Sequence, residues 1–272
     1  MAVLQGATEL FPVSSLGHAV VLPALLGWPI DQKDPSFLPF LVMLHVGTAV
    51  ALLGFFWRDW LALGLGVLGL KDAHQNSESR RVFLLIVIAT IPAVVVGFVL
   101  EKFLRGLFGS PVVAAAFLVV NGVLLLVGEK LRGGATSHKP LAALTTVDAV
   151  VIGVWQCLAL IPGISRSGAT IVGGLLRGVD HEGSARFSFL IAIPVILGAT
   201  VLEVPHLMHA GVTSAVFVQA AIAAVAAGIT ALLSIWFLMT YFRDHDNWAL
   251  SPFAYYCIVA GLGSLAILKF VY

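Results

Sequence analysis

Charged residues are scarce in this sequence. Only 11% of its 272 residues are charged, 60% are apolar, and the mean hydropathy is +1.03. Soluble globular proteins carry about 25% charged and about 45–50% apolar residues, so a soluble globular protein is excluded and a surface that faces lipid is predicted. The sequence also lacks an excess of basic charge, because its 15 Lys and Arg residues are balanced by 14 Asp and Glu residues. Without a broad basic surface, the chain is not expected to bind nucleic acid.

Cysteine is equally rare. Cys157 and Cys257 stand in apolar surroundings at a spacing that matches no metal-binding motif, so we expect two free, packed thiols. The first residues lack the basic segment and small-residue cleavage site of a secretory signal, and Gln5 and Glu9 interrupt their apolar run. We therefore expect no cleaved signal peptide.

Long apolar stretches are what the sequence does contain. A helix needs about 20 apolar residues to cross a hydrocarbon core ~30 Å thick. Six stretches approach that length: 37–57, 82–100, 111–127, 185–202, 212–239 and 253–268. The pattern predicts an all-α polytopic membrane protein with about six transmembrane helices, in which 70–81 and 128–146 form loops. For His45 and Asn121, inside these helices, we favour interhelical hydrogen bonding, with cavity lining as the alternative.

Two further apolar regions, 1–27 and 148–178, are interrupted by clusters of Pro, Ser and Gly at 11–17 and 161–168. Pro and Gly end helices, which leaves pieces of about 10 to 15 residues, or ~15–22 Å, too short to cross. We interpret both regions as re-entrant helical hairpins. Non-helical backbone at that depth persists only where protein or trapped water satisfies it, so both tips are predicted to face an internal cavity.

A hairpin followed by three spans occurs twice in this order. An odd number of spans per half places the second half upside down relative to the first, which predicts an inverted repeat. We expect a single membrane domain over 1–272, with halves at 1–130 and 148–272.

Basic residues are distributed unevenly between the two faces of this topology. One face receives Arg58, Lys71, Arg80, Arg81, Lys130, Arg132, Lys139, Arg177, Arg186 and Arg243. The other receives Lys33, Lys102, Arg105 and Lys269. Because cytoplasmic loops carry the excess of Lys and Arg, the first face is predicted to be cytoplasmic and both termini to lie outside.

Each hairpin tip contains an ionisable residue, Glu9 in the first and Arg166 in the second. A charge near the bilayer centre costs ~2.5–3.5 kcal/mol or more, so the pair is either a structural ion pair or a functional site. The neighbouring residues favour a site for phosphate, because hydroxyls, amides and a guanidinium beside a helix N-terminus bind phosphate oxygens. They are Gln5, Ser14, Ser15 and His18 around Glu9, and Gln156, Ser165, Ser167, Gly168 and Thr170 around Arg166.

Ser15 and His18 are about one helical turn apart, so a hydroxyl nucleophile and an imidazole base are predicted to meet on one face. Glu9 would orient the base, assist proton transfer or hold a divalent ion. A serine or histidine in a membrane helix is about as often a packed structural group as a catalytic one. A transporter also points helix ends at an anionic substrate. Phosphate hydrolysis and phosphate transport therefore both stay open here, although an anion carrier has less need of Glu9.

Segment 5–18 reads QGATELFPVSSLGH, and segment 162–170 reads PGISRSGAT. Both closely resemble the motifs of the undecaprenyl-pyrophosphate phosphatase family, also known as bacitracin-resistance proteins, and the similarity continues to the C-terminus. By position, Glu9 matches the essential motif glutamate and Ser15 the nucleophilic or proton-relaying serine. His18 matches the motif histidine, and Arg166 the pyrophosphate-binding arginine. The hydroxyls around that arginine are matched by Ser165, Ser167 and Thr170.

The resemblance implies a multi-pass protein of the bacterial inner membrane that converts undecaprenyl pyrophosphate to undecaprenyl phosphate and inorganic phosphate. Such a protein recycles the carrier lipid of cell-wall synthesis. The resemblance also implies a divalent metal at Glu9, magnesium or alternatively calcium, a site that opens outward, and resistance to bacitracin, which sequesters the substrate. Carriage or flipping of the lipid phosphate is the alternative function, and association into a homo-oligomer is left open.

Some residues depart from the family pattern. Gln5 occupies the first acidic position, an allowed substitution that removes one carboxylate from any metal site, and Leu16 stands where Thr or Ser is frequent. The type 2 phosphatidic acid phosphatases share the Ser-Gly-His and Ser-Arg elements. Val172 and Leu176 stand where that class requires His and Asp, so it is excluded.

Overall fold

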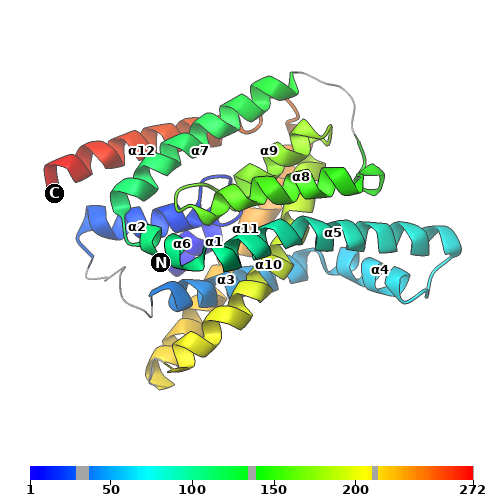
Figure 1. Cartoon of the computed structure of the whole chain (residues 1–272), viewed down its shortest axis with the longest axis horizontal. Coiled ribbons are helices and arrows are strands. Elements are labelled where there is room, and N and C mark those ends of the chain that lie inside the picture. Colours follow the sequence, from blue (N-terminus) through cyan, green and yellow to red (C-terminus); the bar gives the residue numbers. More distant parts are fainter. Residues whose placement is uncertain (29–36, 134–138, 210–213, 272) are drawn as a thin grey trace.

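The structure is a computed structural model that describes residues 1–28, 37–133, 139–209 and 214–271 (Figure 1). Every regular element within those ranges is helical. The α-helices are α1 (Ala2–Thr8), α2 (Ser15–Leu26), α3 (Phe37–Phe55), α4 (Trp57–Val67), α5 (Ala73–Val99), α6 (Glu101–Phe108), α7 (Pro111–Arg132), α8 (Thr146–Cys157), α9 (Arg166–Leu176), α10 (His181–His209), α11 (Ser214–Asp244) and α12 (Ser251–Val271). Two 3₁₀ turns, η1 (Leu141–Ala143) and η2 (Leu158–Leu160), flank α8.

Five segments of the described helices are long and apolar enough to cross a membrane. They are Ala73–Val99, Pro111–Arg132, His181–Leu202, Val218–Asp244 and Ser251–Phe270. A sixth crossing is obtained if Phe40–Phe55 and Trp57–Val67 are counted as one span, although this pair bends by 73°. The prediction of an all-α polytopic membrane protein with about six transmembrane helices is confirmed. The inverted relation of its two halves stays a prediction.

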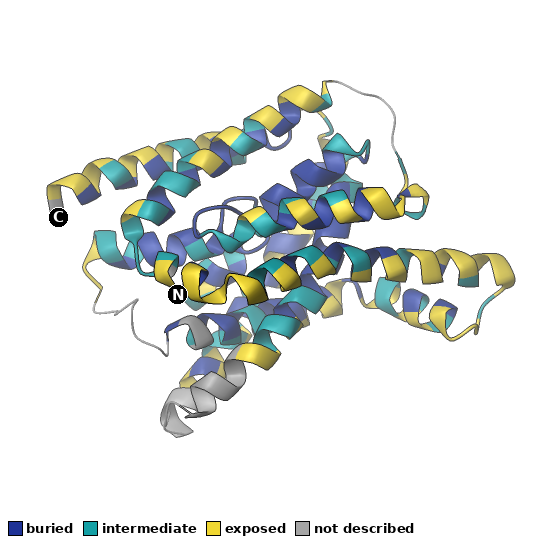
Figure 2. Ribbon diagram, viewed as in Figure 1, coloured by how far each residue is buried: buried dark blue, intermediate teal, exposed yellow. Residues whose placement is uncertain are grey.

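The outer faces of the long helices are exposed, whereas the buried residues gather at the hairpins (Figure 2). The exposed side chains on these faces are apolar, for example Phe98 of α5, Val123 of α7 and Val259 of α12. In water such a continuous apolar surface would be unfavourable, but lipid solvates it. In Figure 1, α1 begins and α12 ends on the left side of the molecule, while α4 and the start of α5 lie on the right.

The predicted loops at 70–81 and 128–146 are too long. Asp72 caps α5 by accepting a hydrogen bond from the Gln75 N–H at 2.9 Å, and the helix then includes the polar residues assigned to the loop. Similarly, α7 continues to Arg132, after which Gly133 adopts a left-handed conformation. Hydropathy marks where a chain leaves lipid, whereas caps determine where a helix begins and ends. Lys33 and residues 134–138 and 212–213, which also entered the predictions, lie outside the described residues.

Both predicted hairpins consist of two short helices joined at the expected break. At the first tip, Ser14 adopts φ 70° and its hydroxyl accepts a hydrogen bond from the Gly17 N–H at 3.1 Å, which opens α2. At the second tip, Ser165 accepts from the Gly168 N–H at 3.1 Å and opens α9. The four helices α1, α2, α8 and α9 contain 7, 12, 12 and 11 residues, so none is long enough to cross the membrane.

The two hairpin tips pack against each other, and Asn121 of α7 joins them. The Asn121 amide donates to the Pro12 carbonyl at 2.9 Å and accepts from the Ser165 N–H at 2.9 Å. The predicted interhelical hydrogen bonding of Asn121 is therefore confirmed. The tips approach so closely that a Cβ on Gly17 would lie 3.0 Å from Gly163 Cα, and glycine at both positions permits this contact.

Candidate functional site

A cavity of about 220 Å³ lies where the two hairpin tips meet α3, α5 and α10. Its polar lining residues are Glu9, Ser14, Ser15, His45, Gln156, Ser165 and Arg166, and we call this part of the lining the polar end. The remaining walls are aliphatic, including Leu41 and Val42 of α3 and Val195 and Ile196 of α10. The tips therefore do face an internal cavity, and this cavity combines a charged end with apolar walls.

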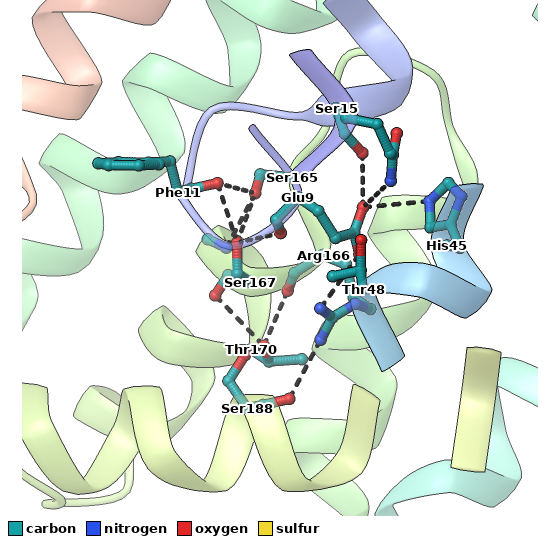
Figure 3. A network of polar contacts seen from close by, with 12 residues as sticks. Glu9, Phe11, Ser15, His45, Thr48, Ser165, Arg166, Ser167, Thr170 and Ser188 are labelled. Carbon is teal, nitrogen blue, oxygen red and sulfur yellow. Dashed lines mark hydrogen bonds and ion pairs between the residues drawn. The ribbon is translucent and has the colours of Figure 1, made fainter. Parts of the chain in front are cut away.

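Glu9 is the centre of the polar end, and four donors converge on it, of which Figure 3 labels Ser15, His45 and Arg166. Its Oε2 accepts a hydrogen bond from the Ser15 hydroxyl at 2.6 Å and lies 3.1 Å from His45 Nε2. Its Oε1 accepts from Arg166 Nη2 at 3.2 Å. Gln5, one turn earlier on the chain, donates to Oε2 at 3.2 Å. A carboxylate that is only 7% exposed is thus held by donors from α1, α2, α3 and α9.

Arg166 is the first residue of α9, which directs its side chain toward the first hairpin. Its Nη1 donates to the Ser188 carbonyl of α10 at 3.1 Å, and its Nη2 donates to Glu9. Its Nε is buried without a hydrogen-bond partner, and so are the side-chain oxygens of Gln5 and Gln156. Buried polar atoms without partners are rare in native proteins, so their concentration around this cavity indicates a place for a ligand or water.

His45 bridges α3 and the first hairpin. Its Nδ1 lies 2.7 Å from the Leu41 carbonyl of its own helix, and its Nε2 lies 3.1 Å from Glu9. Both partners are acceptors, so both bonds form together only when each ring nitrogen carries a proton. Sequence reasoning favoured interhelical hydrogen bonding for His45 and kept cavity lining as the alternative, and the structure places His45 in the cavity lining. The available signal was a lone polar residue inside an apolar span, and such residues mark functional sites.

His18 does not meet Ser15, contrary to the sequence-based expectation. Its Nδ1 lies 2.7 Å from the Ser14 carbonyl, and its Nε2 lies 2.8 Å from the Tyr256 hydroxyl of α12, whose ring it also stacks on. Each residue of a helix turns by about 100°, so three residues turn by about 300° and their side chains point about 60° apart. That difference lets Ser15 point to Glu9 while His18 points to α12.

Three residues predicted to bind substrate serve the structure around the cavity and do not line it. Ser167 donates its hydroxyl to the Phe11 carbonyl at 3.1 Å and so ties the two tips together. Thr170 donates to the Ser188 hydroxyl at 2.6 Å, which fixes α9 against α10. The Gly168 N–H donates to Ser165 as part of the cap of α9. Direct roles of these residues in binding stay predictions.

The fit of a divalent metal rests on Glu9, the one carboxylate among the described residues that line the cavity. No group of three or more His, Cys, Asp or Glu side chains suitable for a metal ion exists in the described ranges. Magnesium commonly binds through one or two carboxylates, with substrate phosphates and water as the other ligands. The donor set therefore fits a metal that a phosphate ligand helps to hold, and does not fit a metal held by protein alone.

Comparison with known proteins connects these residues to a family. The model of the bacitracin resistance protein BacA family matches residues 1–263. An undecaprenyl-diphosphatase of Granulibacter bethesdensis is 66% identical, over 99% of this chain and 95% of the relative. Proteins of the same name from Acidiphilium cryptum and Gluconobacter oxydans are 57% and 55% identical, over 99% and 98% of this chain and 96% of each relative. The chain therefore belongs to the bacitracin resistance protein BacA family.

Proposed function

We propose that this chain hydrolyses undecaprenyl pyrophosphate to undecaprenyl phosphate and inorganic phosphate, and so recycles the carrier lipid of cell-wall synthesis. The family match and the names of its relatives support this proposal. The observation that carries it is the ion pair between Glu9 and Arg166 at the polar end of an otherwise apolar cavity. A cavity of this composition suits a ligand with a charged head and a hydrocarbon tail.

Arg166 is the group that binds the pyrophosphate. Its Nε–H is free, and the first backbone N–H groups of α9 have no acceptor within the helix. Phosphate oxygens that accept from the guanidinium bring negative charge close to Glu9 and offset the positive charge of Arg166. Glu9 then becomes a better proton acceptor.

Ser15 is the nucleophile in this proposal. Its Oγ attacks the terminal phosphorus and passes its proton to Glu9 Oε2, with which it already shares the hydrogen bond of 2.6 Å. The bond from that phosphorus to the bridging oxygen breaks, and undecaprenyl phosphate leaves. Water then hydrolyses the phosphoserine: one proton of the water restores the Ser15 hydroxyl, and Glu9 releases its proton to the departing phosphate.

His45 keeps the carboxylate of Glu9 in place throughout this sequence, through its contact with Oε2. We also propose magnesium as the metal of this site, and Glu9 is the residue that would hold it. The metal would neutralise negative charge that develops on the phosphoryl oxygens. Positioning and charge neutralisation account for most of the catalysis in phosphoryl transfer.

The proposed location is the inner membrane of a bacterium, with both termini in the periplasm and the cavity opening outward. The cavity is lined by the first half of α3 and by the later halves of α5 and α10, through Leu41, Ala93 and Ala199. Those helix halves lie toward the face to which the sequence assigns the fewer basic residues. Reporter fusions at the C-terminus test the orientation, because a periplasmic reporter is active only if that end lies outside.

Phosphate release from undecaprenyl pyrophosphate by the purified protein tests the proposed function. The variant Glu9→Gln is compared with Glu78→Gln, which alters a carboxylate that is 52% exposed on α5. We expect the wild type and Glu78→Gln to release phosphate and Glu9→Gln to be slower by ~100-fold or more. Lipid transfer across sealed vesicles without any phosphate release by the wild type would contradict the proposal and support a carrier.

A further inference from the structure

A second cavity, of about 640 Å³, lies at the break between α3 and α4, beside the first turns of α10 and the last turns of α11. Three arginines line it: Arg58 of α4, Arg186 of α10 and Arg243 of α11. We call this cavity the arginine groove. The proposed reaction uses none of its residues.

The arginine groove is separate from the catalytic cavity. Arg186 in the groove and Val195 in the catalytic cavity are nine residues apart on α10, or ~14 Å along the helix. On α3, Phe55 and His45 are ten residues apart, or ~15 Å. The groove lies toward the start of α10 and the end of α3, whereas the catalytic cavity lies toward the opposite ends of both helices. The two cavities therefore lie in opposite halves of the bundle.

The charges in the groove leave guanidinium donors available for an anion. Arg186 forms an ion pair with Asp59, which compensates one arginine. Arg58 lies over the Trp57 ring at 5.4 Å and makes no ion pair with any described residue. Arg243 contacts Asp244 only through its Nε, at 3.4 Å, and its side chain is 61% exposed. Glu182 also lines the groove, so its lining carries three positive and two negative side chains.

Apolar and aromatic side chains also line the groove, and they favour a lipid over a soluble anion as its ligand. Phe55, Phe56 and Met239 line it, together with Trp236, whose side chain is exposed. Exposed tryptophan and arginine residues at the end of spanning helices lie at the depth of lipid headgroups. Basic pockets between transmembrane helices at that depth bind anionic headgroups.

We propose that the arginine groove binds the headgroup phosphate of an anionic glycerophospholipid, such as phosphatidylglycerol. Arg58 and Arg243 bind the phosphate from either side, and the acyl chains lie along the exposed apolar face of α11 next to Trp236. Because α4, α10 and α11 all contribute to the groove, a lipid bound there holds these helices together. This site goes beyond the proposed function and does not depend on it.

Lipid binding to delipidated, purified protein in detergent tests the proposal. Phosphatidylglycerol, phosphatidylcholine or a polyprenyl phosphate is added in separate samples, and bound lipid is counted by native mass spectrometry while the melting temperature is recorded. The double variant Arg58→Gln/Arg243→Gln is compared with Arg80→Gln/Lys130→Gln, which removes the same charge from exposed positions outside the groove. A lipid-free melting temperature within a few degrees of the wild type shows that each variant is folded.

We expect phosphatidylglycerol, and not phosphatidylcholine, to bind and to raise the melting temperature of the wild type and of the control. In Arg58→Gln/Arg243→Gln, the affinity should fall by ~10-fold or more, because charge-assisted hydrogen bonds to the phosphate are lost. Equal binding of both lipids, unchanged binding by the groove variant, or groove binding of a polyprenyl phosphate alone would overturn the proposal. Phosphate release by the groove variant in detergent should stay within about twofold of the wild type, so failure of this proposal is distinguishable from failure of the proposed function.

Discussion

Ser15 Oγ lies 2.6 Å from Glu9 Oε2, although Ser15 begins α2 and Glu9 follows α1. The break between the two helices brings them together, because Ser14 adopts a left-handed φ of 70° and turns the chain back. A continuous helix would place residues six apart on different faces and ~9 Å apart along the axis. The hairpin tip is therefore what places a hydroxyl on a carboxylate inside the membrane.

Arg166→Lys is expected to reduce phosphate release by ~30-fold to 1,000-fold, although the charge is kept. The guanidinium donates to Ser188 and Glu9 through two different nitrogens, and its Nε–H has no partner in the protein and can bind a ligand. A lysine ammonium cannot reproduce this planar arrangement of donors. The measurement is kcat and KM for undecaprenyl pyrophosphate. Arg80→Lys, at an exposed position of α5, is the control and should retain full activity. Near-normal turnover by Arg166→Lys would exclude bidentate binding of the pyrophosphate.

His45→Leu is expected to lower kcat by ~10-fold to 100-fold with a smaller effect on KM. The leucine removes the donor to Glu9 Oε2, and a hydrogen bond to a charged group contributes ~1.5–3 kcal/mol. His45→Gln should recover part of the loss, because the glutamine amide can still donate to the carboxylate. If His45→Leu and His45→Gln have equal activities, then His45 acts only through packing. His74→Leu, at an exposed position of α5, is the control.

Removal of divalent metal is expected to abolish phosphate release, and added magnesium should restore it. Since Glu9 is the one carboxylate among the described residues of the cavity, the protein without substrate should bind magnesium only weakly, with a Kd of ~1 mM or more. Calorimetric titration of the substrate-free protein measures this affinity. Micromolar binding without a phosphate ligand would show that the protein alone forms the metal site.

Asp246→Asn is expected to lower the melting temperature at pH 7 but not near pH 2. Asp246 joins the α11–α12 connection to Arg132 at 2.8 Å and to His181 at 3.0 Å. Burial opposes ionisation, but hydrogen bonds from Arg132 and His181 lower the pKa of Asp246 from 3.8 to about 2. The folded pKa is below the unfolded one, so this stabilisation is present above the unfolded value and is lost as the pH falls through the folded value.

The control for Asp246→Asn is Asp244→Asn, because the Asp244 side chain is 58% exposed and forms only a surface ion pair. Melting temperatures of both variants and the wild type are compared between pH 7 and pH 2. A difference between Asp246→Asn and the wild type that stays constant over this range would show that the carboxylate charge does not stabilise the connection.

Much of the fold was predictable because it depends on local properties of the chain. Apolar length indicated the spans, and the Pro, Ser and Gly clusters indicated both hairpin breaks, because these residues end helices wherever they occur. The ends of α5 and α7 were missed, since their polar turns extend beyond the apolar segments. The bend between α3 and α4 was also missed, because Gly54 lies inside a continuous apolar stretch and was interpreted as part of the span 37–57.

The candidate site was predictable in its residue types but only partly in its contacts. The ion pair between Glu9 and Arg166 follows from the cost of leaving either charge unpaired within the membrane. The contacts of Glu9 with His45 and of His18 with Tyr256 were not predictable from residue spacing. They depend on the direction in which each side chain leaves its helix relative to neighbours distant in the chain.

By itself the sequence determined an all-helical membrane protein with two interrupted apolar segments, each with a charged residue near its tip. Those properties follow from the transfer energy of single residues and from the backbone limits of Pro and Gly. Only the tertiary structure decided that Asn121 joins the two tips and that Ser15 and His45, rather than His18, contact Glu9. Partners on separate helices are selected by how the helices pack, and packing is a property of the assembled bundle rather than of any one segment.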